Sequence, residues 1–160
     1  MSLSGLENLD VWRKARNFAV KVYREILPSL PQDEKWGLNQ QIRRAAQSVP
    51  ANIAEGYGRY YYQENIRFCY IERGSLEETI SHLSLAHELE YIPDILFKGL
   101  VKQCDDLPRL INGYIAHLKR TKQGEDNPGA DMVVRESKSI YDTESIGYPS
   151  SESTGSATDE

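Results

Sequence analysis

Apolar residues recur at intervals of three and four positions in four separate stretches of the chain. This spacing is typical of amphipathic helices, which bury one face and expose the other. The four stretches cover about residues 9–27, 33–57, 63–89 and 93–122. No stretch shows the strict alternation of a strand, and there is no internal repeat, so the pattern predicts an all-α fold.

Short connections join the predicted helices, with about four to seven residues in each. Connections of this length favour antiparallel neighbours, so the expected architecture is an up-down-up-down four-helix bundle. Pro50 and Pro108 fall inside the second and fourth helices, where proline removes one backbone hydrogen bond and clashes with the preceding turn. We therefore expect a kink at Pro50 and a kink or a split at Pro108. Gly74, in the middle of the third helix, indicates the close approach of another helix.

The composition of the chain changes after residue 122. Residues 123–160 contain no Leu, Phe, Trp or Cys and are rich in Ser, Thr, Gly, Asp and Glu. Such a segment buries too little apolar surface to offset the entropy of ordering it, so we expect a disordered tail after a bundle domain over residues 1–122. The bundle carries 17 Lys and Arg against 15 Asp and Glu, whereas the tail carries 2 against 9. A slightly basic domain is thus predicted to precede a strongly acidic tail.

Targeting signals are not visible in the sequence. Residues 1–12 have no basic leader, and no apolar run approaches the roughly 20 residues of a membrane span. We therefore expect a cytoplasmic location and no membrane partner. Cys69 and Cys104 lie far apart in sequence and lack metal or redox spacing, so they are expected to be reduced, semi-buried thiols.

The signatures of enzymes are missing as well. There is no glycine-rich phosphate loop, no Gly-x-Ser-x-Gly elbow and no Glu-x-x-His pair of the kind that di-iron bundles use. Glu78 and His82 are four residues apart and are expected to form a solvated helix pair, because two ligands make a poor metal site. The sequence predicts a protein that is not an enzyme, with no catalytic residues, no metal, no cofactor and no small-molecule substrate.

The second predicted helix is the unusual element. It is rich in small residues, with Asp33 as its expected N-cap and Gly56 and Gly58 at its end. Arginine and glutamine side chains on its polar face suit phosphate contacts, and the tyrosines that follow suit either stacking on single-stranded bases or a protein interface. A plain solvated face is the third alternative. The candidate residues for nucleic-acid or partner binding are Gln40, Arg43, Arg44, Gln47, Tyr57, Arg59, Tyr60 and Tyr61.

This helix also carries a resemblance to a known family. Positions 37–56 match, almost throughout, the signature Gly-Leu-x-x-Gln-Ile-Arg-Arg-Ala-Ala-x-Ser-Ile-Pro-Ala-Asn-Ile-Ala-Glu-Gly of the 23S rRNA intervening-sequence protein family, also called four helix bundle protein. The resemblance extends over about residues 6–120 and includes three further motifs. These are Leu9-x-Val11-Trp12-x-x-Ala15, Arg73-Gly74-Ser75-x-x-Glu78 and Leu85-Ala86-x-x-Leu89-x-Tyr91-Ile92.

The resemblance implies a bacterial protein with four antiparallel helices, assembled as a ring-shaped homopentamer without enzymatic activity. Some family members are encoded within insertions in 23S ribosomal RNA genes. A related branch comprises the accessory variability proteins of diversity-generating retroelements, which are basic pentamers that bind nucleic acid and a reverse transcriptase. The present chain departs from the pattern in its long acidic tail, its less basic bundle, and Glu90, which stands where a glycine is usual.

Together these features predict a non-enzymatic, homo-oligomeric helical scaffold, pentameric by resemblance, that associates with RNA or DNA. The alternative is a protein-interaction module whose partner is another protein, such as a reverse transcriptase.

Overall fold

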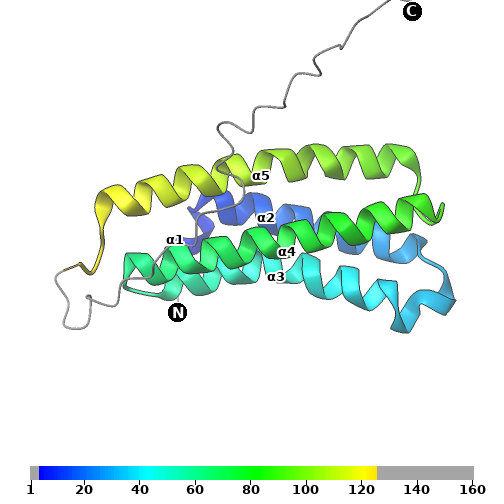
Figure 1. Cartoon of the computed structure of the whole chain (residues 1–160), viewed down its shortest axis with the longest axis horizontal. Coiled ribbons are helices and arrows are strands. Elements are labelled where there is room, and N and C mark those ends of the chain that lie inside the picture. Colours follow the sequence, from blue (N-terminus) through cyan, green and yellow to red (C-terminus); the bar gives the residue numbers. More distant parts are fainter. Residues whose placement is uncertain (1–3, 126–160) are drawn as a thin grey trace, which may run out of the picture.

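The computed structural model describes residues 4–125, which form the expected antiparallel four-helix bundle. The four long helices are α2 (Asp10–Lys21), α3 (Leu38–Gly58), α4 (Tyr62–Glu88) and α5 (Asp94–Thr121). Each helix packs against the next one in the chain, and α2 also packs against α5, which closes the bundle (Figure 1). A short helix, α1 (Ser4–Glu7), precedes them, and the described part of the chain contains no strand. The all-α prediction is confirmed.

The first predicted helix does not remain α-helical to its end. After α2 the chain continues as a π-helical turn, η1 (Val22–Ile26), and then as a 3-10 turn, η2 (Leu27–Ser29). Val22, Ile26 and Leu27 are all buried, so the wider turn keeps this end of the helix facing the core. Tyr23, which lies in η1, remains beside α3 and contributes to the surface described below.

The start of the second predicted helix was placed wrongly at Asp33. A 3-10 turn, η3 (Gln32–Trp36), occupies these residues, and α3 begins only at Leu38. The side chain of Glu34 pairs with a free backbone N–H at the start of α3, because its Oε2 accepts a hydrogen bond from the N–H of Leu38 at 2.9 Å. A carboxylate in this position pairs with a free N–H group and interacts favourably with the positive end of the helix dipole.

Neither internal proline breaks its helix. α3 runs on through Pro50 to Gly58, and α5 runs on through Pro108 to Thr121, so the expected split at Pro108 does not occur. Buried apolar residues flank both prolines, among them Val49 and Leu107. Packing of this kind supplies most of the stability of a helix in a protein and offsets the lost hydrogen bond.

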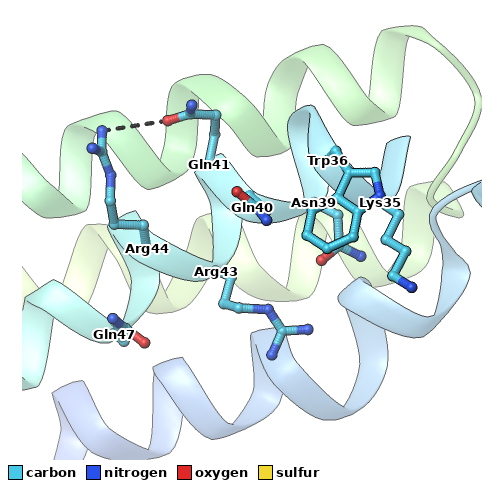
Figure 2. A pocket seen from close by; sticks show the side chains of 8 residues that line it. All are labelled: Lys35, Trp36, Asn39, Gln40, Gln41, Arg43, Arg44 and Gln47. Carbon is cyan, nitrogen blue, oxygen red and sulfur yellow. Dashed lines mark hydrogen bonds between the residues drawn. The ribbon is translucent and has the colours of Figure 1, made fainter. Parts of the chain in front are cut away.

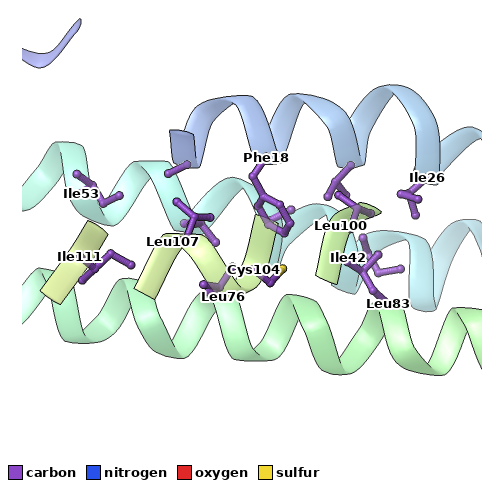
Figure 3. Packing of buried hydrophobic residues seen from close by; sticks show 14 of the residues in the cluster. Phe18, Ile26, Ile42, Ile53, Leu76, Leu83, Leu100, Cys104, Leu107 and Ile111 are labelled. Atoms are coloured by element: carbon purple, nitrogen blue, oxygen red, sulfur yellow. The ribbon is translucent and has the colours of Figure 1, made fainter. Parts of the chain in front are cut away.

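The core lies along the axis of the bundle and takes large apolar side chains from all four helices (Figure 3). α3 and α4 are the most closely packed pair. A Cβ on Gly56 would lie 2.8 Å from the Cβ of Phe68, so glycine is needed there for close approach and does not end α3 as predicted. A Cβ on Gly74 would meet nothing within 4 Å, so the close contact expected at Gly74 does not exist among residues 4–125.

At two positions of α4, the buried residue is the one that precedes the residue predicted to be buried. In the sequence, the stem of Arg73 and the side chain of Ile80 follow the three-and-four spacing of Ile66, Leu76 and Leu83, which predicts both on the inner face. In the structure Glu72 and Thr79 are fully buried instead, while Arg73 and Ile80 are half-buried. Two adjacent charged residues give the hydrophobic pattern no means of choosing between them, and the packing of the neighbouring helices decides.

The turn between α4 and α5 forms without the usual glycine. Glu90 adopts a left-handed backbone conformation with φ of 59°. The N–H of Glu90 donates to the carbonyl of His87, and the N–H of Tyr91 donates to the carbonyl of Ala86, both at 2.9 Å. These two bonds form a Schellman motif, the commonest helix ending that places a glycine in the left-handed position. The turn therefore keeps its geometry with a residue that is strained in it.

α5 ends at Thr121, one residue before the boundary predicted for the bundle. The prediction of a disordered tail over residues 123–160 concerns, after Glu125, residues that lie outside the described part. None of the helices in residues 4–125 is long and apolar enough to cross a membrane.

Candidate nucleic-acid interface

Four of the eight candidate residues lie together on the first half of α3. Gln40, Arg43, Arg44 and Gln47 line a hollow of about 440 Å³ at the surface of the bundle. The remaining lining residues come from η3 and from the first turn of α3, and none of the eight side chains is acidic (Figure 2). They are Lys35, Trp36, Asn39 and Gln41.

Arg43 and Arg44 point away from each other across this hollow (Figure 2). The guanidinium of Arg43 turns towards the N-terminal part of the bundle and lies 4.9 Å from the centroid of the Tyr23 ring. The Tyr23 hydroxyl in turn donates to Gln47 Oε1 at 2.9 Å. The guanidinium of Arg44 turns towards α4, where its Nη2 lies 3.5 Å from Glu78 Oε1. Arg43 is therefore stacked on an aromatic ring, whereas the charge of Arg44 is partly balanced by a carboxylate.

The other four candidates lie at the opposite end of α3. Arg43 and Tyr57 are separated by about 21 Å along the helix axis, given a rise of about 1.5 Å per residue. Arg59 forms a salt bridge with Glu55 at 2.7 Å and covers the ring of Phe68 at 5.4 Å. The structure thus divides the predicted surface into two groups, and at this end the basic charge is neutralised locally.

The tyrosines at this end pack against the two ends of the described chain. The Tyr57 hydroxyl lies beside Gly5 of α1, and the Tyr60 ring lies beside Gly124. Tyr61 is half-buried and makes an edge-to-face contact with Tyr62, with ring centroids 5.3 Å apart. Tyr60 retains 62% of its surface exposed and is the tyrosine of this group most open to a ligand. The main contribution of the group within the described chain is to hold the termini against the bundle.

Sequence reasoning missed the cations outside α3 that are held by aromatic rings. The guanidinium of Arg16 lies 4.9 Å from the centroid of the Trp12 ring, and Lys35 Nζ lies 5.2 Å from that of Trp36. Trp12 and Tyr23 both pack partly against the core, as the apolar stripe of the first helix predicted. The missed signal is Arg16, which lies four residues after Trp12 and seven before Tyr23 and so shares their helix face.

Nucleophilic and metal-binding chemistry has little support among the described residues. Cys69 and Cys104 are free and buried, and burial raises the pKa of each thiol to about 12, so neither is a thiolate at neutral pH. His82 Nε2 lies 3.7 Å from Glu78 Oε1, so the two residues share a helix face, but this nitrogen is buried and has no hydrogen-bond partner among the described residues, unlike the solvated pair that was predicted. Within residues 4–125 no three His, Cys, Asp or Glu side chains form a metal-binding group.

Among the acidic residues of the described chain, Glu72 has the largest shift in pKa. Its side chain is fully buried, and neither carboxyl oxygen has a hydrogen-bond partner. Burial raises the pKa of Glu72 to about 8, against the opposing charge of the adjacent Arg73. Perturbed acids often mark functional sites, but Glu72 does not line the α3 hollow. We interpret it as a feature of the core that makes the stability of the bundle depend on pH.

Comparison with known proteins identifies a protein family and a structural neighbour. The model of the 23S rRNA-intervening sequence protein family matches residues 7–113. A crystal structure of a protein with unknown function from the S23 ribosomal protein family of Bacteroides thetaiotaomicron superposes with a TM-score of 0.60. Its sequence is 24% identical, and the match covers 66% of this chain and 97% of that one, which supports the bundle fold. No curated protein matches.

Proposed function

This chain belongs to the 23S rRNA-intervening sequence protein family, and we propose that it is a non-enzymatic, homo-oligomeric scaffold that associates with RNA. The observation that carries the RNA association is the hollow on α3. Three cationic side chains, those of Lys35, Arg43 and Arg44, line it together with amides and an exposed tryptophan, and no acidic side chain does. Such a lining suits the phosphate backbone, which proteins contact mainly through arginine, lysine and amide groups.

The outer face of α4 supports self-association. Ile71, Leu85 and Leu89 are 44%, 50% and 45% exposed on a helix whose inner face is already buried. Gly74 lies between them in the chain, with open space where a Cβ would be. An apolar face of this kind suits burial against a second copy of the chain, and the pentamer that the family resemblance implies would bury it in every protomer.

Oligomerisation would strengthen a weak RNA site. One protomer offers about three phosphate contacts in the hollow, and the bundle as a whole is nearly neutral. A ring repeats the hollow in each subunit, and linked weak sites gain roughly 10²–10⁴ in avidity. The assembly is thus the means by which a nearly neutral domain would hold RNA.

The mass of the full chain in solution and its binding of RNA test this proposal together. Light scattering should give a multiple of 18.2 kDa, and Leu85→Lys should lower that mass because it places a charge in the proposed interface. At about 50 mM salt, where electrostatic contacts are strong, the wild type should bind RNA and the double variant Arg43→Glu, Arg44→Glu should not.

The matched control makes the same change in charge on α5, by Lys102→Glu with Arg109→Glu. Both residues are exposed there, and the control should retain RNA binding. A monomer at tens of micromolar would refute the scaffold. Lack of RNA binding by an oligomeric wild type would instead favour the second candidate function, a protein-interaction module with a protein partner such as a reverse transcriptase.

A further inference from the structure

Three cations along the α2–α3 side of the bundle are each stacked on an aromatic ring. The pairs are Lys35 with Trp36, Arg43 with Tyr23, and Arg16 with Trp12, at 5.2, 4.9 and 4.9 Å. We refer to these six residues as the α2–α3 stripe.

The contacts of Tyr23 set the geometry of the stripe. Tyr23 joins the two helices, because its ring lies under Arg43 and its hydroxyl bonds to Gln47, both on α3. Arg16 lies two helical turns before Tyr23 on the same face, which corresponds to about 10 Å along the axis. The stripe therefore extends from the hollow on α3, through Tyr23, to Arg16 and Trp12 on α2.

The cations of the stripe are held by aromatic rings and not by carboxylates. Within residues 4–125, Lys35, Arg16 and Arg43 form no salt bridge with a carboxylate, whereas Arg13 and Arg59 are paired with Asp10 and Glu55 at 2.8 and 2.7 Å. An arginine stacked on a ring is held in one orientation while its N–H groups and its outer plane stay free. The stripe thus presents oriented positive groups that have not been neutralised.

Trp36 adds an open stacking surface at one end of the stripe. Its side chain is 75% exposed, and the structure shows it at the edge of the hollow beside Lys35 (Figure 2). Bases stack on such rings only when they are free of their own neighbours, because the bases of a duplex already stack on one another. A positively charged groove with interleaved aromatic rings is the arrangement that binds single strands.

We infer that the α2–α3 stripe binds a single-stranded nucleic acid, with a base stacked on Trp36 and with phosphates at Arg43 and Arg16. This inference rests on the proposed RNA association and gives that site its substrate class. Stacking and phosphate contacts are available from every nucleotide, so little sequence preference is expected.

The experiment compares two probes with the full chain at about 50 mM salt. One is a labelled uridine oligomer of about 12 nucleotides, which falls within the range of single-strand site sizes, and the other is an RNA duplex of the same length. The single strand should bind at least about fivefold more tightly. Its binding should quench tryptophan fluorescence, and Trp36→Leu should abolish the quenching and weaken single-strand binding by about fivefold or more, without affecting the duplex. Trp36→Phe should retain most of the affinity.

Charge variants locate the path of the strand. Arg16→Glu should weaken binding as much as Arg43→Glu does, whereas Lys102→Glu on α5 should have little effect. All variants should keep the mass and melting temperature of the wild type. Equal binding of both probes, or binding that survives both Arg16→Glu and Trp36→Leu, would overturn the inference and leave the proposed RNA association intact. If the wild type binds neither probe, both this inference and the proposed RNA association are overturned.

Discussion

α3 and α4 are the most closely packed helices of the bundle, yet they distribute polarity in opposite ways. α3 buries apolar residues such as Ile42 and Ile53 and turns its charges outward. α4 buries a carboxyl group, that of Glu72, and exposes Ile71 and Leu85. The arrangement on α3 is that expected of a helix in a monomeric bundle. On α4, by contrast, the buried carboxyl lowers the stability of the core, and apolar side chains remain exposed on the outer face. This contrast underlies the two proposals, a contact on the outer face of α4 and an RNA site on α3.

The two helices also differ in how they accommodate charge. The cation of Arg43 stays at the surface and is held by the ring of Tyr23, at little cost in desolvation. The carboxyl of Glu72 lies in the core without a hydrogen-bond partner, and burial of this kind disfavours the ionised form. The charge of Arg43 therefore lies at the surface, where a ligand can reach it, whereas Glu72 stays protonated until the pH rises towards its raised pKa.

The largest effect that tests this contrast is a loss of stability as the pH rises. The pKa of Glu72 is raised by burial to about 8, so the folded state binds a proton that the unfolded state releases above about pH 4.5. The contribution of protonated Glu72 to the free energy of unfolding is fully present below about pH 4.5 and is lost as the pH rises through about 8. We expect the free energy of unfolding to fall by roughly 3–5 kcal/mol across this range, as measured by urea denaturation.

Two variants isolate the source of this pH dependence. Glu72→Gln should remove most of the slope because it does not titrate, and Glu72→Met should in addition stabilise the protein above pH 8, where the wild type buries a charge. Glu78→Gln, at an exposed position on the same helix, should keep the slope. A slope that persists in Glu72→Gln would assign the pH dependence to other groups.

An overpacking effect of intermediate size is expected on α3. Ala46 is fully buried against the core, so Ala46→Leu should destabilise the bundle by about 1–3 kcal/mol and can also weaken the oligomer. Ala51 lies on the same helix but is exposed, and Ala51→Leu should change stability by less than about 0.5 kcal/mol. Thermal unfolding of the pair checks the prediction, and equal melting temperatures for the two variants would contradict it.

The smallest effect concerns the ends of the two helices. α3 ends in Gly58, whereas α4 is followed by Glu90 with φ of 59°. Glu90→Gly should relieve the left-handed strain and stabilise the protein by about 1 kcal/mol, less the entropy that glycine adds to the unfolded chain. The control is Glu88→Gly, within α4, which should destabilise by about 1 kcal/mol. A Glu90→Gly variant that melts below the wild type would show that the glutamate side chain stabilises the turn.

The sequence by itself determined the number of long helices, their approximate limits and their antiparallel order. These follow from local causes, namely the 3.6-residue period of apolar positions and the short connections, and the helices of the structure confirm them. It also identified the family, because the signature at positions 37–56 is dense and contiguous. Gln40, Arg43, Arg44 and Gln47 were placed on one surface for the same reason, since neighbours on one helix face need no tertiary information.

The tertiary structure alone decided which residues of different helices meet. It brought Tyr23 of the N-terminal part beside Arg43 and Gln47 of the hollow on α3. It also placed Glu72 rather than Arg73 in the core, and Gly56 rather than Gly74 at the close contact with a neighbouring helix. The rotation of each helix about its axis depends on how its side chains fit between those of its neighbours. A periodic pattern in one helix does not contain that information.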